Sequence, residues 1–311
     1  MATYKSTKGL SVEVLAADPT TDDTIGLLYL NTTDNEFKYV RPATIAAGTW
    51  ASGGNLNTGR GSSLPSQAGT QTAGMAATGG NPSNVTNVEQ YNGSSWTEIA
   101  DVNTARQAGG GAGTSTATLI FGGNSPKVDT ESFNGTSWTE LNNLNTSKQT
   151  PRGTGTQTAA IAVGGYPNNN RTETWNGTSW TEVANLNTAR GAGQCMGLQS
   201  AALFAGGGYP SVAVVENWNG SSWTEVNDLN TVCSDGGAAG TSTLGLAFRL
   251  GTNEAWDGTS WTEQNNLGVS REGMSGCGTQ TSALGFGGGP NKANTEEFTV
   301  PDVVIKTVSD S

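Results

Sequence analysis

WNGTSWTE, at Trp175–Glu182, is the stretch that decides the fold, because close variants of it return along the chain. The variants are YNGSSWTE at Tyr91–Glu98, FNGTSWTE at Phe133–Glu140, WNGSSWTE at Trp218–Glu225 and WDGTSWTE at Trp256–Glu263. The second tryptophan recurs as Trp96, Trp138, Trp180, Trp223 and Trp261, and Trp50 opens the series without the Asn-Gly pair. Successive tryptophans are 46, 42, 42, 43 and 38 residues apart. A period in this range indicates a repeat architecture.

Each copy of the stretch predicts a tight turn between two short strands. Asn-Gly readily adopts the positive φ values that such a turn needs, and the residues on either side favour strands. We therefore interpret each copy as a structural hairpin and not as an active site.

The composition agrees with a turn-rich β protein and excludes several classes of partner. Gly and Pro account for 45 and 10 of the 311 residues, a combined share of about 18% against roughly 12% in an average protein. The net charge of -11 argues against nucleic acid and anionic membranes as partners. Cys195, Cys233 and Cys277 fall in different repeats without metal-ligand spacing, so we interpret them as small apolar fillers. We expect no cofactor and no metal site.

The two ends of the chain stand outside the repeats. Residues 1–43 are expected to form a docking arm, with strands at Ser11–Leu15, Ile25–Leu30 and Glu36–Val40, that orders by attaching to another protein. The first residues, MATYKSTKGLSVEV, lack the apolar run of a signal peptide, and no stretch is long and apolar enough to span a membrane. Residues 44–300 hold the repeats, and 301–311 are expected to be a C-terminal tail.

The repeat units share an order of landmarks. A basic residue ends the segment Asn-Leu-Asn-Thr-Ala-Arg or a relative of it, a Gly/Ala-rich strand follows, and a more apolar strand ends in paired glycines. A glutamate then stands seven residues before the tryptophan, and an aromatic stands five before it. The fifth unit departs, with Phe248-Arg249-Leu250-Gly251 in place of the glycine pair. The glutamates of the series are Glu89, Glu131, Glu173, Glu216 and Glu254, with Glu296 in the matching place of the last unit.

This order resembles the kelch repeat over roughly residues 50–300. The resemblance implies an all-β fold, a β-propeller whose blades are four-stranded sheets. Counting strands predicts six blades. The last unit stops after its third strand at Phe298, so we expect residues near Ile45–Asn55, with Trp50, to supply the missing outer strand and close the ring.

The repeated residues favour structural roles. A catalytic carboxylate is needed once or twice, whereas this glutamate occurs in every unit, so we expect it to pair with the arginine series or to accept backbone N–H bonds. The tryptophans and aromatics are expected to pack between blades, although such rings can also stack on sugars. Enzyme chemistry has little support: copper sites of the galactose-oxidase type need imidazole, and the chain has no histidine. The box of sialidase-like propellers has an Asp where Trp175 stands here.

The phrase IGLLYLNTTDNEFKYV is similar to short hairpin modules near the N-termini of tailed-bacteriophage virion proteins. This resemblance implies a non-enzymatic virion component, made in the host cytoplasm, whose residues 1–43 bind other virion proteins. The propeller is then expected to recognise a host surface glycan or protein. Tail fibre and capsid decoration roles both remain open. The alternatives are a bacterial carbohydrate-binding or scaffold propeller and, with least support, a hydrolase with an unrecognised site.

The loops that follow the glycine pairs vary between units, whereas the Asn-Gly turns hardly vary. Antiparallel topology places these two sets of loops at opposite ends of the strands. Variable loops on a shared scaffold are where individual contacts can be built. The candidate ligand-binding residues are Tyr166, Tyr209, Asn168 and Asn124.

Overall fold

The computed structural model describes residues 13–17, 28–33, 35–41, 47–61, 68–81, 83–167, 170–208, 211–300 and 304–307. Every regular element within these ranges is a β-strand. The chain divides into a large unit, Thr49–Thr299, and a small unit made of Met1–Gly48 together with Val300–Ser311. Both ends of the chain therefore contribute to the small unit.

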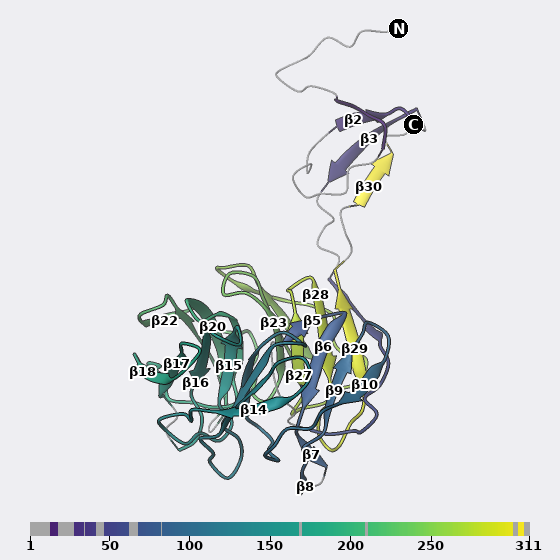
Figure 1. The fold of residues 1–311 in the computed structure, drawn as a ribbon. Helices are drawn as coiled ribbons and strands as arrows, with labels where there is room; N and C mark the ends of the chain where they lie inside the picture. The colour runs from purple at the N-terminus through teal and green to yellow at the C-terminus, as the bar shows by residue number, and fades with distance from the viewer. Residues whose placement is uncertain are drawn as a thin grey trace. The chain divides into compact units, whose positions relative to one another are not determined.

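The large unit is a series of six four-stranded antiparallel sheets, in a propeller-like arrangement (Figure 1). Sheet 1 contains β5 (Gly69–Thr70), β6 (Ala73–Ala77), β9 (Val88–Tyr91) and β10 (Trp96–Ile99); sheet 2 contains β11 (Gly110–Gly113), β12 (Thr118–Phe121), β13 (Thr130–Phe133) and β14 (Trp138–Leu141). Sheet 3 contains β15 (Arg152–Gly155), β16 (Ala160–Val163), β17 (Thr172–Trp175) and β18 (Trp180–Val183); sheet 4 contains β19 (Gln194–Leu198), β20 (Ala201–Gly207), β21 (Val212–Trp218) and β22 (Trp223–Val226). Sheet 5 contains β23 (Gly237–Gly240), β24 (Gly245–Arg249), β25 (Thr252–Trp256) and β26 (Trp261–Glu263); sheet 6 contains β27 (Ser275–Gly278), β28 (Ser282–Phe286), β29 (Thr295–Thr299) and β4 (Thr49–Ser52). A two-stranded ribbon, β7 (Gly80–Asn81) and β8 (Ser83–Asn84), extends from sheet 1.

The repeated stretch forms the turn between the third and fourth strands of sheets 1 to 5. In sheet 3, Gly177 has a φ of 92°, and the side-chain oxygen of Asn176 accepts the backbone N–H groups of Thr178 and Ser179 at 2.9 and 2.8 Å. Asp257 makes the same turn in sheet 5, and the N–H groups that it accepts hold its carboxyl pKa well below the usual range. The side-chain cap explains why this short turn recurs with so little change.

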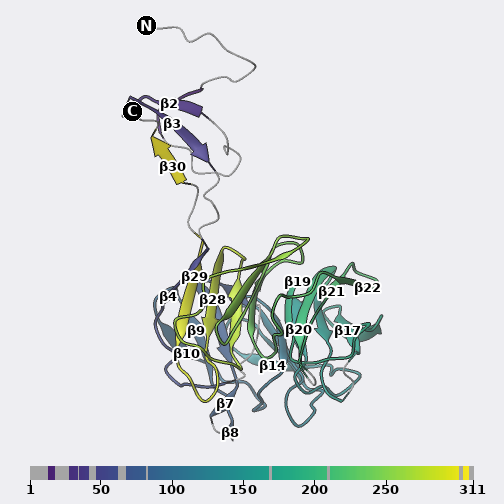
Figure 2. The same cartoon turned by 180° about the vertical axis from the view of Figure 1, so that it is seen from behind.

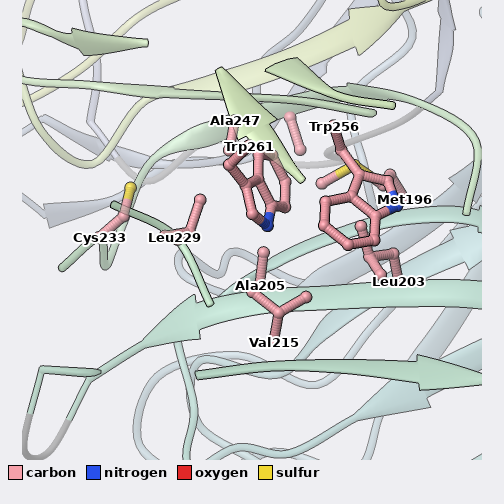
Figure 3. Close-up of a cluster of buried hydrophobic side chains, with 10 residues drawn as sticks. Met196, Leu203, Ala205, Val215, Leu229, Cys233, Ala247, Trp256 and Trp261 are labelled. Carbon is pink, nitrogen blue, oxygen red and sulfur yellow. The ribbon is translucent and has the colours of Figure 1, made fainter. Parts of the chain in front are cut away.

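Apolar side chains fill the spaces between neighbouring sheets. Between sheets 4 and 5, Trp256 and Trp261 pack with Met196 and Leu203, and Cys233 lies at the edge of the same cluster (Figure 3). Gly110 and Gly153, on neighbouring inner strands, both face the ring of Phe121, where an added Cβ would come within 2.3 Å. The inner strands therefore carry small side chains, since large aromatic rings from the second strands pack against them.

One backbone hydrogen bond repeats between successive sheets. The donor is the residue at the second position of the glycine pair, a position held by Gly79 after Thr78 in sheet 1 and by Leu250 in sheet 5, and the acceptor is the carbonyl of the basic residue, or its substitute, that precedes the next sheet. The bonds are Gly79 to Arg106, Gly123 to Lys148, Gly165 to Arg190, Gly207 to Cys233, Leu250 to Arg271 and Gly288 to Arg60. The last of these joins sheet 6 to sheet 1, which also share a cluster containing Trp96 and Phe286. In Figure 1 the yellow strands of sheet 6 accordingly lie beside the blue strands of sheet 1.

Sheet 6 takes its outer strand from the beginning of the large unit. β4 pairs antiparallel with β29, and Trp50 stands opposite Phe298 (Figure 2). This is the strand exchange expected from the missing fourth strand of the last repeat. Thr49 and Thr299 are also partners, so both connections to the small unit leave the large unit side by side.

The small unit differs from the predicted docking arm of residues 1–43 and the predicted C-terminal tail of residues 301–311. Its sheet has four strands in the order β1 (Glu13–Leu15), β2 (Leu28–Asn31), β3 (Glu36–Arg41) and β30 (Val304–Thr307). β30 pairs with β3, so residues predicted as a C-terminal tail belong to this sheet, and the unit boundaries fall at 48/49 and 299/300 instead of 43/44 and 300/301. The reason is the pairing of Thr49 with Thr299, which brings the two chain ends together. Within the described part of the chain, no helix has the length and apolar character needed to cross a membrane.

Candidate functional site

The glutamate series forms a buried polar ladder, one carboxylate in each sheet of the large unit. In sheet 2, Glu131 accepts the backbone N–H of Asn103 at 2.8 Å, the Asn103 side-chain amide at 3.0 Å and the guanidinium of Arg106. Neither Glu131 nor Arg106 is reached by solvent. A carboxylate bound in this way anchors the segment that enters each sheet and is closed to a ligand.

The same arrangement recurs with different cations. Glu89 pairs with Arg60 at 2.9 Å, Glu216 with Arg190, and Glu296 with Arg271. Sheet 3 has a lysine, and Lys148 Nζ lies 4.0 Å from Glu173. Burial lowers the pKa of Lys148 to about 8, against the raising effect of Glu173. Burial likewise lowers the pKa values of Arg60, Arg106 and Arg190.

Sheet 5 breaks the ladder. Cys233 stands where the other sheets have a cation, and among the described residues Glu254 keeps the bonds to Asn230 and Thr231 but has no cationic partner. Burial raises the pKa of the Cys233 thiol to about 12, as it does for Cys195 and Cys277, so these thiols are not activated nucleophiles. Leu250 replaces the second glycine and has a φ of 46°.

The exchange of Arg for Cys and of Gly for Leu in sheet 5 has a common steric reason. In four other sheets a Cβ on the second glycine would lie against the arginine side chain of the same sheet. The distances from this Cβ to the arginine side chain are 3.2 Å for Gly79 with Arg60, 3.3 Å for Gly123 with Arg106, 3.1 Å for Gly207 with Arg190 and 3.0 Å for Gly288 with Arg271, and a backbone carbonyl lies at a similar distance in each case. Cys233 has no such stem, so one of the contacts that crowd this position in the other sheets is missing in sheet 5.

The predicted ligand residues fall on the variable loops but do not all face solvent. Tyr166 is 55% exposed, and its backbone exchanges two hydrogen bonds of 2.8 Å with Gln149, which fix the backbone from which the ring extends. Asn124 instead exchanges amide hydrogen bonds with Asn84 and accepts the N–H of Gln107. Asn124 therefore links the loops of sheets 1 and 2, and its contact with a ligand stays a prediction. Asn168 and Tyr209 lie outside the described residues.

A chain of backbone hydrogen bonds runs across the starts of the inner strands. Thr150 N–H donates to Ala108, Ala192 to Thr150, Asp235 to Ala192 and Gly273 to Asp235, over 2.7–3.0 Å. All five residues have positive φ values. Arg152 bridges the same edge, donating to the Gly193 carbonyl at 3.2 Å and to the Asp235 carboxylate at 3.1 Å. These contacts link the bases of the variable loops across sheets 2 to 6.

The small unit presents an exposed apolar row. Val14 stands beside Leu30, and Leu30 beside Phe37, so the three side chains share one face of the sheet. Val14 is 64% and Phe37 is 41% exposed. The other face buries Tyr29 and Lys38, which are partners across the same two strands. The open face of this sheet is therefore apolar, whereas the covered face holds a lysine.

The tryptophans serve packing. The outer-strand members from Trp96 to Trp261 are buried, and each indole N–H donates to a neighbouring group. Trp180 packs edge-on to Phe121 of the preceding sheet at 4.8 Å and donates to Thr130 Oγ1 at 3.0 Å. Buried rings in this setting cannot stack on a sugar. In the described residues no group of three His, Cys, Asp or Glu side chains is placed to hold a metal ion.

Several structural residues escaped the sequence analysis. Gln157, Gln199 and Gln280 each donate to two carbonyls at the strand ends of the preceding sheet, and Gln71 does the same from sheet 1 to sheet 6. The repeated Thr-Gln-Thr at 70–72, 156–158 and 279–281 is the signal that could have shown them. The sequence marked the fifth unit as an exception through Leu250, but it did not show that Cys233 leaves Glu254 without a cation.

Comparisons with known proteins support the fold alone. No protein-family model matches the chain, and no curated protein matches it in sequence. The solved structure of YjhT is similar, with a TM-score of 0.65 and 12% identity over 82% of this chain and 99% of that one. At this identity the likeness shows a shared propeller-like arrangement of repeated sheets.

Proposed function

We propose that the large unit is a closed, six-bladed kelch-like β-propeller and that the protein is a non-enzymatic component of a tailed-bacteriophage particle. The bond from Gly288 to Arg60 and the pairing of β4 with β29 support closure, since they join the last sheet to the first residues of the large unit. In this proposal the small unit attaches the protein to other virion proteins. The variable loops bind a host surface glycan or protein.

The observation that carries this proposal is the exposed row Val14–Leu30–Phe37 on a sheet built from both chain ends. In sequence terms the large unit is an insertion between β3 and β30, which are paired strands of one sheet. An attachment unit interrupted by a second unit is a suitable design for display, because two chain connections carry the displayed part. Both connections leave at Thr49 and Thr299, at the strand ends that bear the Asn-Gly turns, and the variable loops lie at the opposite strand ends.

The non-enzymatic part of the proposal rests on where the repeated carboxylates and the thiols lie. The repeated carboxylates are buried in the ladder, and burial raises the pKa of each thiol. Tyr166 offers an exposed ring on a fixed backbone, which is suited to binding rather than to catalysis.

Two measurements test the proposal. Mass spectrometry of particles purified from the lysed host should detect the chain, and Val14→Thr with Phe37→Thr should remove it from the particles while the purified protein melts normally. Particles that carry Tyr166→Ala should adsorb poorly to host cells. Ser94→Ala with Ser137→Ala, in the exposed Asn-Gly turns, is the matched control. Particles without the chain, or full incorporation of the Val14/Phe37 variant, would contradict attachment by this surface.

A further inference from the structure

Four turns of the large unit place an exposed asparagine directly before a glycine, at Asn92, Asn134, Asn176 and Asn219. Attack by the glycine nitrogen on the asparagine side-chain carbon closes a five-membered ring, so the chain itself holds the two reacting atoms close together. Glycine has no side chain to hinder this nitrogen. In the part of the chain that the structure describes, the N–H groups of these four glycines donate to no protein group. Each turn therefore holds a free nucleophile beside a side-chain amide.

Two N–H donors face the asparagine side-chain oxygen in each of these turns. Asn134 Oδ1 accepts the backbone N–H groups of Thr136 and Ser137, both at 2.9 Å, and matching pairs serve the other three asparagines. When a nucleophile adds to a carbonyl, negative charge develops on the carbonyl oxygen. Donors that already face that oxygen lower the barrier to the addition. The hydrogen bonds that cap the turn therefore also activate the amide.

The fifth turn shows that an aspartate fits the same place. Asp257 stands at the position of the asparagines, and its carboxylate accepts the N–H groups of Thr259 and Ser260 at 2.8 and 2.7 Å. Hydrogen bonds to a carboxylate are stronger than those to a neutral amide. Conversion of an asparagine to aspartate therefore keeps the turn and adds one negative charge to it.

We propose that these four asparagines deamidate spontaneously in their turns, with aspartate as the main product. The glycine nitrogen adds to Cγ and gives its proton to water, and the amide nitrogen takes a proton and leaves as ammonia. Water then adds to the resulting succinimide and opens the ring, so the whole reaction consumes one water and releases one ammonia. Addition at the former side-chain carbonyl gives aspartate, and addition at the main-chain carbonyl gives isoaspartate. Because the turn donors face the side-chain oxygen, they favour aspartate.

Two of the four turns have a further donor. The hydroxyl of Ser94 donates to the side-chain oxygen of Asn92 at 3.0 Å, and that of Ser221 donates to Asn219 at 2.9 Å. Threonine takes this place in the other two turns, and among the described residues the threonine hydroxyls make no such bond. We therefore expect Asn92 and Asn219 to deamidate first. The inference goes beyond the proposed function and does not depend on it.

Peptide mapping by mass spectrometry tests the inference on the purified full-length protein, incubated at mildly alkaline pH and sampled at intervals. The unfolded chain in guanidinium chloride is the reference, and isoaspartyl methyltransferase labels isoaspartate. We expect Asn92 and Asn219 to convert faster in the folded chain than in the unfolded chain, with more aspartate relative to isoaspartate. Ser94→Ala should slow the conversion of Asn92 by roughly threefold or more, because one donor is lost. Asn219 in the same variant is the matched control and should convert as in the wild type.

Slower conversion in the folded chain would show that the turns protect their asparagines and would overturn the inference. An unchanged rate at Asn92 in Ser94→Ala, or isoaspartate as the main product of the folded chain, would also overturn it. Asn176→Asp tests the fit of the product and should melt at or above the temperature of the wild type, so a clear loss of stability would contradict that fit. These measurements use the purified protein, so their outcome is separate from the detection of the chain in particles.

Discussion

The backbone N–H of Gly288 donates to the carbonyl oxygen of Arg60 over 3.0 Å, and this bond joins the last sheet of the large unit to the segment that enters the first. Five equivalent bonds join the other neighbouring sheets. The Arg60 side chain reaches Glu89 within sheet 1, so the residue is tied to both sheets at once. The stability of the large unit should therefore depend on the short stretch from β4 to Arg60.

Two truncations test this dependence. Residues 49–299 should fold and melt in one cooperative transition, because every strand of the six sheets is kept. Residues 57–299 lack β4 and Leu56, so they should melt at lower temperature and aggregate through the uncovered edge of β29. Circular dichroism and light scattering during heating provide the comparison. Equal melting of the two chains would show that β4 adds nothing to stability.

The repeat pattern predicted more of the fold than of the surfaces. The tryptophan spacing, the Asn-Gly turns and the missing fourth strand indicated the sheets and the origin of β4, because these features depend on local turn chemistry and on a repeated pattern. β30 was missed, since a short apolar run after Pro301 does not show which distant strand it joins. Pairing with β3 depends on where Thr49 and Thr299 place the two chain ends.

Replacing Trp180 by Ala should lower the free energy of unfolding by about 3–5 kcal/mol, the usual range for a buried large aromatic. The ring is lost from its contact with Phe121, and Thr130 loses its donor. Thr130→Val should lower the free energy of unfolding by less than Trp180→Ala does, because the ring stays in place. Val88 of sheet 1 already occupies the position that Thr130 has in sheet 2. The neighbouring tryptophan, Trp138, donates instead to the Ala100 carbonyl at 3.0 Å, which shows that the indole can find another acceptor. Urea denaturation measures both changes, and a Thr130→Val loss as large as that of Trp180→Ala would contradict the packing role of the ring.

Lys148→Arg should change how stability varies with pH. Unfolded Lys148 keeps its proton to about pH 10.5, whereas burial lowers its pKa in the fold to about 8. Between these values the unfolded chain binds more protons, so this residue makes the free energy of unfolding rise with pH. Arginine stays charged throughout and removes that rise. Between pH 8 and 10.5 the melting temperature of the wild type should rise relative to that of the variant.

The difference between the two proteins isolates Lys148, because the buried cysteines lower stability at alkaline pH equally in both. Lys127→Arg is the matched control: Lys127 is half-buried in the variable loop of sheet 2 and pairs with Asp129 at 3.7 Å. It should leave the pH dependence unchanged. Parallel curves for wild type and Lys148→Arg would exclude a depressed lysine pKa.

The candidate surfaces were harder to predict because their residues are defined by departures from the repeat. Tyr166 was found because an aromatic on a variable loop stands out in sequence. Asn124 was chosen because it lies on a variable loop, but nothing in sequence shows that its amide pairs with Asn84 from the preceding sheet. Val14, Leu30 and Phe37 form a row only once the register of three strands is known.

Cys233→Arg and Leu250→Gly should be strongly coupled. In four other sheets the arginine side chain lies 3.0–3.3 Å from the place of a Cβ on the second glycine, so Cys233→Arg alone would press against Leu250. Such overpacking typically destabilises by about 1–3 kcal/mol. Leu250→Gly alone should be neutral or stabilising, because glycine adopts a positive φ without strain.

Together the two changes recreate the arrangement of the other sheets and give Glu254 a cation. The double variant should therefore unfold at higher urea than Cys233→Arg, with a coupling energy above about 1 kcal/mol in a double-mutant cycle. Additive effects would show that Cys233 and Leu250 do not share one steric constraint.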